Sequence, residues 1–387
     1  MKRGLIGRYE TTTVAGETVR AFIPGPLPPV PSLQLEGALN HLLERALLAL
    51  GRLDSVTTLL PGTDLFLYAY VRKEAVLSSQ IEGTQSSLSD LLLFELEQAP
   101  GVPLNDVQEV SNYVAAMDHG IQQLRKDFPL SSRLIREIHE KLLARGRGSD
   151  KEPGQFRRSQ NWIGGTRPGT AAFVPPPQIL VADCVSDLEK FIHNPDNTLP
   201  VVIQAGLVHV QFETIHPFLD GNGRVGRLLI TLLLCAAGLL QEPLLYLSLF
   251  FKQNRPEYYR LLDAVRKEGD WEKWLLFFLR GVAETAEGAV TTARRLVALF
   301  DEDRARLQGL GRQTGSVLRI HDALKQRPVC TIEDSRKRTG LSFPSTASGM
   351  KLLVKNGIVR ELTGKKRNRI YVYDRYLSIL SEGTEPI

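Results

Sequence analysis

The chain carries a run of reactive residues at 216–227, His-Pro-Phe-Leu-Asp-Gly-Asn-Gly-Arg-Val-Gly-Arg. The imidazole of His216 can act as a general base, and the carboxylate of Asp220 is the kind of ligand that hard divalent cations prefer. The Gly-Asn-Gly turn offers backbone N–H groups, and two arginines supply fixed positive charge. Together these are the parts that a site for phosphoryl or nucleotidyl transfer needs.

The segments on either side of this run predict the helices that position it. Residues 201–212 are apolar with helical spacing, and 228–240 are almost wholly apolar and long enough for a buried helix. The Gly-Asn-Gly turn is therefore expected to open a buried helix, whose free N–H groups and dipole form an anion site. Arg224 and Arg227 are three residues apart, so they project from one face of its first turn. Basic residues there oppose the helix dipole, which indicates that an anion sits between them.

The run resembles the signature of the Fic family, His-x-Phe-x-Asp/Glu-Gly-Asn-Gly-Arg-x-x-Arg, and every specified position is met. The resemblance extends well beyond the motif, over residues 20–285. Fic proteins usually transfer AMP from ATP to a hydroxyl side chain of a target protein, so the resemblance implies ATP as co-substrate and Mg²⁺ as cofactor. It also implies a general base at His216, a loop anchor at Phe218, a metal ligand at Asp220, a phosphate cradle of Gly221, Asn222 and Gly223, a phosphate brace at Arg224 and a γ-phosphate contact at Arg227.

A second motif lies at 78–83, Ser-Ser-Gln-Ile-Glu-Gly, at the end of a helix predicted over 64–81. It matches the inhibitory motif of the Fic family, Ser/Thr-x-x-x-Glu-Gly/Asn, which implies that Glu82 restrains activity. A carboxylate at a helix C-terminus is disfavoured by the helix dipole, so a cationic partner is expected nearby. We expect a bidentate pair between Glu82 and Arg227 in place of the γ-phosphate oxygens, with Ser78 steadying the carboxylate from one turn earlier.

The segment Asn-Arg-Pro-Glu-Tyr-Tyr at 254–259 offers an amide and two neighbouring aromatic rings at a helix start. Such groups can hydrogen-bond and stack on a base. In the Fic family this segment borders the adenosine end, so the resemblance implies nucleotide contacts from Asn254 and Tyr258. The alternative is that one of the two tyrosines belongs to the core.

Other histidines have structural interpretations. His139 lacks the second histidine of a zinc-binding helix, so we interpret it as a buried, hydrogen-bonded residue. His209 and Glu213 are four residues apart on the helix before the motif, without a third ligand in register. We interpret this pair as support for the motif loop.

The sole clear β signal before residue 320 lies at 157–177, where Gly-Gly and Pro-Gly dipeptides separate short apolar pieces. The hairpin at 160–175 resembles the Fic flap, an exposed strand that pairs with an extended segment of a target protein. The alternative is a hairpin with a purely structural role.

The fold class that follows is mainly α: a Fic-type helical core with a β-hairpin flap, and a small winged helix-turn-helix domain at the C-terminal end. Residues 1–35 are rich in proline and are expected to form a non-helical arm. Periodicity predicts helices at 39–50, 64–81, 88–96, 107–126, 131–145, 180–193, 201–212, 228–240, 256–266 and 271–306.

Residues 316–387 resemble a winged helix, with helices expected at 316–326, 331–339 and 343–356 and strands at 358–362 and 369–373. Between residues 351 and 369 there are seven basic residues against one acid, Glu361. Such a module places a helix in the major groove and a basic wing on phosphate. A protein-binding module with a solvated basic hairpin is the alternative. The basic residues are Lys351, Lys355, Arg360, Lys365, Lys366, Arg367 and Arg369.

The 387 residues leave room for two or three domains. We predict an N-terminal arm and inhibitory-helix region at 1–105, a Fic catalytic core at 106–285, a helical extension and linker at 286–315, and the winged helix at 316–387. The net charge of +5 is compatible with a nucleotide or nucleic-acid partner without requiring one.

Composition and termini favour a cytoplasmic protein without a membrane partner. Cys184, Cys235 and Cys330 are odd in number and far apart, which fits a reducing compartment. The first ten residues lack the apolar core of a signal peptide. The longest apolar run, 228–240, is shorter than the ~20 residues that span a bilayer. The oligomeric state, a homo-oligomer included, stays open.

The sequence thus predicts a Mg²⁺-dependent enzyme that transfers AMP from ATP to a Ser, Thr or Tyr hydroxyl of a target protein or of itself, autoinhibited by Glu82. Two alternatives remain open. One is a DNA-binding transcriptional regulator with a nucleotide-sensing Fic pocket, and the other is a Fic enzyme that transfers another phosphate-containing group. The target, the modified residue and any reverse, AMP-removing activity are not readable from the sequence.

Overall fold

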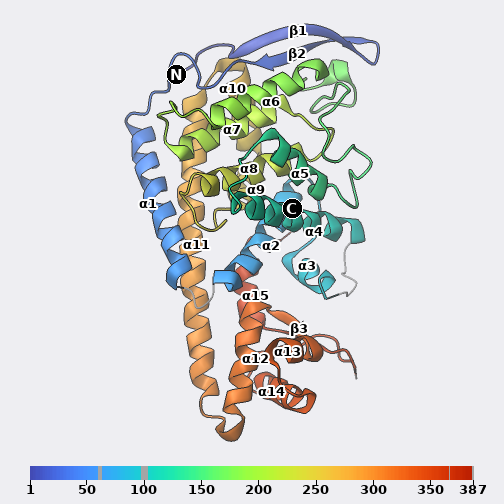
Figure 1. Ribbon diagram of the computed structural model, residues 1–387, viewed down its shortest axis with the longest axis vertical. Coiled ribbons are helices and arrows are strands. Elements are labelled where there is room, and N and C mark those ends of the chain that lie inside the picture. The colour runs from blue at the N-terminus through green and yellow to red at the C-terminus, as the bar shows by residue number, and fades with distance from the viewer. Residues whose placement is uncertain (60–62, 97–102, 366, 386–387) are drawn as a thin grey trace.

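A computed structural model describes residues 1–59, 63–96, 103–365 and 367–385. The molecule is elongated and mainly α-helical, as predicted (Figure 1). Its longest element is α11 (Trp271–Leu307), which runs along most of the molecule with α1 (Ala38–Leu59) packed beside it. The helices that come between α1 and α11 in the sequence are α2 (Thr63–Ile81), α3 (Leu88–Phe94), α4 (Leu104–Leu124), α5 (Ser132–Leu142), α6 (Val181–Ile192), α7 (Val201–Ile215), α8 (Asn222–Ala236), α9 (Ser248–Gln253) and α10 (Arg255–Glu268).

The two helices that flank the reactive run, α7 and α8, form the centre of the core. Both are apolar on nearly every side, and a helix of that kind is buried all round. The helix α8 begins at Asn222, so the Gly-Asn-Gly turn opens it as expected. It ends at Ala236, earlier than the predicted residue 240, because Gly238 takes a left-handed conformation that no helix continues.

The N-terminal arm is non-helical, as predicted, but the prediction that 157–177 holds the sole clear β signal before residue 320 is contradicted by two strands in the arm. Strands β1 (Gly7–Val14) and β2 (Glu17–Pro24) pair antiparallel along their full length. Ala15 and Gly16 both have positive φ, which is the geometry of a two-residue hairpin turn. The prediction was wrong because the prolines lie at and beyond the end of β2, while the strands themselves are rich in threonine and valine.

The predicted hairpin at 157–177 is reduced to one antiparallel bridge between Ile163 and Phe173. A short 3₁₀ turn at Pro168–Thr170 connects the two sides. The returning segment is also attached to the N-terminal hairpin, because the Phe22 N–H donates to the Val174 carbonyl at 2.9 Å. We keep the name flap for residues 160–175.

The C-terminal unit lies at the lower end of the molecule in Figure 1. Its three predicted helices are α12 (Thr314–Gln326), α13 (Ile332–Thr339) and α14 (Phe343–Lys355), and its predicted strands are β4 (Arg360–Glu361) and β5 (Ile370–Val372). A strand and a helix were not expected: β3 (Val329–Thr331), which completes a sheet of order β3-β5-β4, and α15 (Asp374–Ser381). The assignment as a winged helix stays a prediction.

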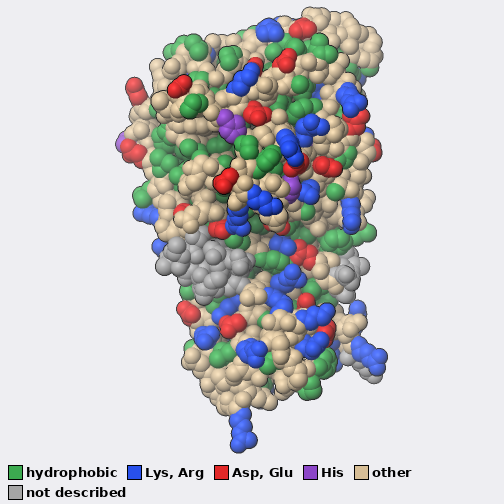
Figure 2. Space-filling view, in the orientation of Figure 1, with side chains coloured by type: hydrophobic (Ala, Val, Ile, Leu, Met, Phe, Trp, Pro, Cys, Tyr) green, Lys and Arg blue, Asp and Glu red, His purple; other side chains and the backbone are tan. Residues whose placement is uncertain are grey.

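Figure 2 shows Lys and Arg side chains over this lower end, mixed with acidic and apolar ones. The hydrophobic core continues without a break from α1 into α15, so the predicted domain boundaries also stay predictions. Within the described ranges, no helix combines the length and the apolar character needed to cross a bilayer.

Candidate active site

A cavity of about 480 Å³ lies where α7, α8 and α10 meet the flap and the end of α2. Parts of both motifs identified in the sequence open onto it. From the reactive run come His216, Gly223 and Arg227, and from the second motif comes Glu82. The remaining walls are formed by Ile163, Ala172, Phe173, Glu213, Tyr258, Tyr259, Leu262, Asp263, Arg266 and Lys267.

His216 caps the C-terminus of α7 in a left-handed conformation, with φ 49° and ψ 61°. Few non-glycine residues adopt this conformation, and the surrounding structure must hold it. Arg157 does so: it is buried, and its Nε donates to the His216 carbonyl at 3.0 Å. Burial, followed by the charges of Arg266 and Arg157, lowers the pKa of His216 to about 3, against a smaller opposing effect of Glu82. The imidazole is therefore neutral at physiological pH, and one of its ring nitrogens is unprotonated.

Phe218 anchors the loop that follows His216. Its ring is fully buried and stacks on His139 with 3.7 Å between centroids. The Asn222 Oδ1 accepts from the Phe218 N–H at 2.9 Å, and its Nδ2 donates to the Phe218 carbonyl at 2.8 Å. The Asn222 side chain thus braces the loop, which leaves only its backbone for the predicted phosphate cradle.

His139 is a buried, hydrogen-bonded histidine, as interpreted from the sequence. Its Nδ1 accepts from the Gly154 N–H at 2.9 Å, so its Nε2 donates to the Asp220 carbonyl at 3.0 Å. Burial lowers the pKa of this imidazole to about 4. His139 therefore fixes the backbone of the loop at Asp220 and binds no metal here.

The carboxylate of Glu82 faces the N-terminus of α8. Its Oε1 lies so close to Gly223 that a Cβ at this glycine would collide with it. The same oxygen accepts from Arg227 Nη2 at 2.7 Å. Burial raises the pKa of Glu82, but Arg227 outweighs burial and leaves the pKa below its usual value. An ionised carboxylate therefore sits in the predicted anion site.

Two details of this contact differ from expectation. The pair has one hydrogen bond and is not bidentate. Ser78 does not steady the carboxylate, because its hydroxyl accepts from Arg227 Nε at 2.9 Å and its carbonyl accepts from Arg227 Nη2 at 3.0 Å. The last turn of α2 thus binds the Nε and Nη2 edge of the guanidinium, and Nη2 divides its two N–H groups between the Ser78 carbonyl and Glu82.

Arg224 has a buried acidic partner that the sequence did not reveal. Its Nη1 donates to Glu109 Oε2 at 3.2 Å, and Arg147 lies 3.3 Å from the other oxygen of this carboxylate. Burial raises the pKa of Glu109. The Arg224 Nε and Nη2 are buried without a hydrogen bond, as expected of a guanidinium placed to receive an anionic ligand. No local signal identifies Glu109, because it lies 115 positions away on α4.

Asp220 is one-third exposed beside the start of α8. Its Oδ1 accepts from the Gly221 N–H at 2.6 Å and lies 3.6 Å from Arg224 Nη2. Across the described part of the chain, no three His, Cys, Asp or Glu side chains gather into a metal site. One carboxylate with a solvent-facing side fits Mg²⁺, which is commonly held by one or two carboxylates together with substrate phosphates and water.

The structure places the two predicted adenosine contacts differently, and their role in binding stays a prediction. Tyr258 lines the cavity, but it is 1% exposed and its hydroxyl donates to His209 Nε2 at 2.7 Å. Asn254 does not line the cavity, because it lies at the start of α10 and its amide donates to the Phe250 carbonyl. Tyr259, 43% exposed, is the ring available for stacking. The core alternative is therefore correct for Tyr258.

His209 and Glu213 have different surroundings, although both lie on α7. His209 is fully buried, and its Nδ1 donates to the Gly226 carbonyl at 2.9 Å, so it supports the α7–α8 contact as interpreted. The Glu213 Oε1 is buried without a hydrogen bond on the cavity wall, and burial raises the pKa of this carboxyl to about 7. It does not share a metal site with His209.

Comparisons with known proteins identify relatives of this chain. Residues 40–122 match the description "Fic/DOC family N-terminal", and residues 129–234 match "Fic/DOC family". "Protein adenylyltransferase Fic" of Drosophila yakuba is 31% identical over 210 residues, which cover 54% of this chain and 38% of that protein. Its counterpart in Drosophila melanogaster is 30% identical, with 54% and 39% covered. The matched region thus spans less than half the length of these curated relatives.

Solved structures show the same fold. A Fic family protein from Desulfovibrio desulfuricans G20 superposes with a TM-score of 0.58 at 20% identity, covering 88% of this chain and 97% of that one. Fic-1 from C. elegans gives 0.50 at 24% identity, covering 67% and 73%. With the complete motif around His216, the two family matches show that residues 40–234 form a Fic/DOC family region, and the solved structures agree with its fold.

Proposed function

We propose that this protein transfers AMP from ATP to a hydroxyl side chain of a target protein or of itself. The observation that carries the proposal is the position of His216, whose neutral imidazole lines one cavity with Gly223 and Arg227 at the start of α8. A base beside an anion site is what this reaction requires. The curated relatives carry the name of the same activity.

In the proposed reaction, His216 accepts the proton of the target hydroxyl. The hydroxyl oxygen forms a bond to the α-phosphorus while the bond from that phosphorus to the β-phosphate oxygen breaks, and pyrophosphate leaves. Arg224 and the N–H groups at the start of α8 bind the phosphates, and Tyr259 stacks on the base. Asp220 would hold Mg²⁺, which when bound supplies positive charge that neutralises the phosphates.

The flap is the proposed docking surface for the target. Ile163, Ala172 and Phe173 line the cavity that contains His216. An extended target segment at this edge would bring its hydroxyl toward the imidazole through main-chain pairing, with little need for a specific sequence. On the other side of the flap, the Val174 carbonyl already accepts from the Phe22 N–H of β2. We therefore expect the target to dock on the side of Ile163.

Glu82 is the residue proposed to inhibit this reaction. Its carboxylate occupies the anion site and engages Arg227, the residue proposed to meet the γ-phosphate. ATP that binds beside Glu82 would lose that contact, and its α-phosphate would be misaligned for in-line attack.

Labelling with two forms of ATP tests the proposal. Incubation of the Glu82→Gly variant with α-³²P-ATP should label protein, and γ-³²P-ATP should not, because AMP carries only the α-phosphate. Combining Glu82→Gly with His216→Ala should lower labelling about 10²–10⁴-fold, the usual contribution of a general base. Label from γ-³²P-ATP would instead indicate phosphate transfer. Absence of any label together with retained ATP binding would favour a nucleotide-sensing regulator.

We also propose that the C-terminal unit contacts DNA, because its basic residues are accessible. Lys351 and Lys355 on α14 and Lys365 and Arg367 after β4 are exposed. Arg360 is already paired with Asp374 through two hydrogen bonds, so it is not counted among the free cations. Lys366 lies outside the described residues. The salt-dependence experiment below tests this second function.

A further inference from the structure

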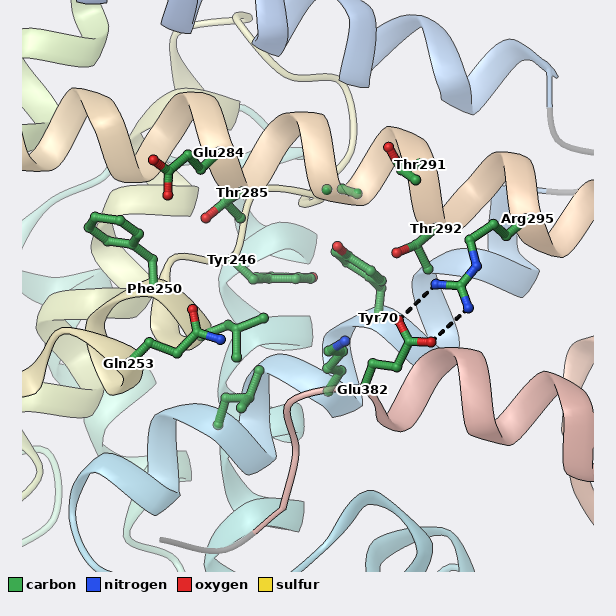
Figure 3. A pocket seen from close by; sticks show the side chains of 15 residues that line it. Tyr70, Tyr246, Phe250, Gln253, Glu284, Thr285, Thr291, Thr292, Arg295 and Glu382 are labelled. Atoms are coloured by element: carbon green, nitrogen blue, oxygen red, sulfur yellow. Dashed lines mark hydrogen bonds and ion pairs between the residues drawn. The ribbon is translucent and has the colours of Figure 1, made fainter.

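A second cavity, of about 360 Å³, lies between α2, α9 and α11 (Figure 3) and shares no lining residue with the cavity at His216. One end is closed by Glu382, which directly follows α15. Its volume is within the range of small-molecule sites, at the lower end. No step of the proposed AMP transfer uses any of its residues.

Lys73 is the feature of this cavity that lacks an explanation. Its side chain lines the cavity and the residue is 8% exposed. No described carboxylate lies within 4 Å of its Nζ, and the described part of the chain offers it no hydrogen bond. Burial lowers the pKa of this ammonium to about 8, although Glu382 and Glu385 act in the opposite direction. The stem of Lys73 is buried while its Nζ is not among the buried atoms that lack a hydrogen bond, so the ammonium opens onto the cavity and is free to receive an anionic ligand there.

The other charges of the cavity do not supply that partner. Arg295 donates to both oxygens of Glu382 at 2.7 Å, and Figure 3 shows this pair joined at one end of the cavity. Glu284 is exposed at the rim and is solvated there. One unpaired positive charge therefore remains inside, which calls for a single negative charge on the ligand and not for a dianion.

The walls beside Lys73 are aromatic. The rings of Tyr70 and Tyr246 lie 5.4 Å apart between centroids, inclined by 33°. They point into the space between α2 and α11, with Phe250 beyond them (Figure 3). Such surfaces favour a flat apolar group by stacking and by exclusion of water.

We propose that this cavity binds a small aromatic carboxylate, with its carboxylate on Lys73 and its ring against Tyr70, Tyr246 and Phe250. The ammonium would gain a charge-assisted hydrogen bond that the protein alone does not provide. The ring would remove from water the small apolar area that these side chains leave exposed to the cavity.

The location of the cavity connects it to the proposed inhibition by Glu82. The helix α2 carries Lys73 on the cavity wall, then Ser78, and ends immediately before Glu82. Beyond Glu382 the chain is fastened to the same helix end, because Gln80 Nε2 donates to the Thr384 carbonyl at 2.8 Å. A ligand bound to Lys73 would stabilise α2 in this docked position and keep Glu82 on Arg227. This regulatory consequence rests on the proposed function, whereas the binding site does not.

Calorimetric titration with benzoate tests the binding site on the full chain. Wild-type protein should bind benzoate, and should bind acetate or benzyl alcohol more weakly, because each lacks the ring or the charge. Lys73→Met should lower the affinity for benzoate at least about tenfold, the value of one charge-assisted hydrogen bond. Lys355→Met, at an exposed lysine of α14, should leave it unchanged.

Two results would overturn the site directly: no benzoate binding by the wild type, or an affinity of Lys73→Met for benzoate equal to that of the wild type. Loss of binding in Arg227→Met alone would also overturn it, because benzoate would then lie in the nucleotide pocket. The regulatory consequence is measured separately, by labelling with α-³²P-ATP. Benzoate should lower labelling by the wild type and should leave labelling by Glu82→Gly unchanged. If benzoate binds through Lys73 but labelling does not respond, the site stands and the link to Glu82 is refuted. If neither variant labels under any condition, the proposed function fails while the calorimetry still decides the site.

Discussion

Glu82 Oε1 and Arg227 Nη2 lie 2.7 Å apart although 145 positions separate them in the sequence. The contact joins the end of α2 to the first turns of α8, directly over Gly223. A carboxylate thus occupies a place that suits a phosphate group, so under the proposed function this contact would compete with ATP, which is open to a direct test.

Glu82→Gly should raise AMP transfer several-fold, because it frees Arg227 and the start of α8 for the phosphates. The rate is measured as α-³²P incorporation over a range of ATP concentrations. Glu36→Gly, at an exposed glutamate before α1, serves as the matched control and should label like the wild type. Equal labelling by Glu82→Gly and wild type at every ATP concentration would reduce Glu82 to a helix-end residue.

Asn222→Ala should lower the free energy of unfolding by about 1–3 kcal/mol, because it leaves the buried Phe218 N–H without an acceptor. The Phe218 carbonyl retains a second donor, Asn161 Nδ2 at 3.0 Å, which limits the loss. Urea unfolding measures the difference. Asn40→Ala, which removes an exposed amide bonded to Glu44, should change stability by less than about 0.5 kcal/mol. Identical midpoints for Asn222→Ala and wild type would mean that the loop is braced by other contacts.

Glu213 should make stability depend on pH near neutrality. Its pKa is about 7 in the folded protein against 4.5 for an ordinary glutamate, so the folded state binds more protons between these values. The free energy of unfolding therefore falls as pH rises from 4.5 through 7, by at most about 1.4 kcal/mol per pH unit. Glu213→Gln cannot ionise and should gain stability relative to the wild type as the pH is raised.

Urea unfolding of both proteins at pH 5.5 and pH 8 measures this effect. The difference between the two proteins isolates Glu213, because the buried histidines titrate equally in both. A difference that is the same at the two pH values would show that the carboxyl ionises without cost at this position.

Replacement of Lys365, Lys366 and Arg367 together by Ala should weaken duplex DNA binding by the full chain. Each lost phosphate contact should reduce the slope of log K against log salt by about 0.9. Fluorescence anisotropy at several salt concentrations measures both quantities. A triple replacement of exposed lysines outside the C-terminal unit, Lys126, Lys141 and Lys190, provides the control. Failure of the wild type to bind DNA at low salt would favour the protein-binding alternative.

Local sequence patterns predicted the helices and the opening of α8, because apolar periodicity and glycine turns act within a few residues. The same reasoning failed at β1 and β2, where the prolines nearby were given more weight than the β-branched residues inside the strands. The flap was predicted as a longer hairpin than the single bridge that forms, since tertiary contact with β2 competes for its returning edge.

The site shows a similar division. The motif placed His216 and Arg227 at the cavity, and the second motif identified Glu82 as the partner of Arg227. Glu109 and Arg157 were not predicted, because each meets its partner through the packing of distant segments. Asn254 and Ser78 were assigned the wrong contacts, since the direction of a side chain depends on helix rotation that no single motif fixes.

The continuity of α11 has a consequence for how many macromolecules the protein can hold at once. Its 37 residues form one helix, about 55 Å long at 1.5 Å per residue. The C-terminal unit is packed at one end of this rod, and α7 and α10, which build the nucleotide cavity, lie toward the other (Figure 1). Nucleic acid at the first end and a protein substrate at the second would therefore be held apart at a set spacing, so that both can be bound together without excluding one another.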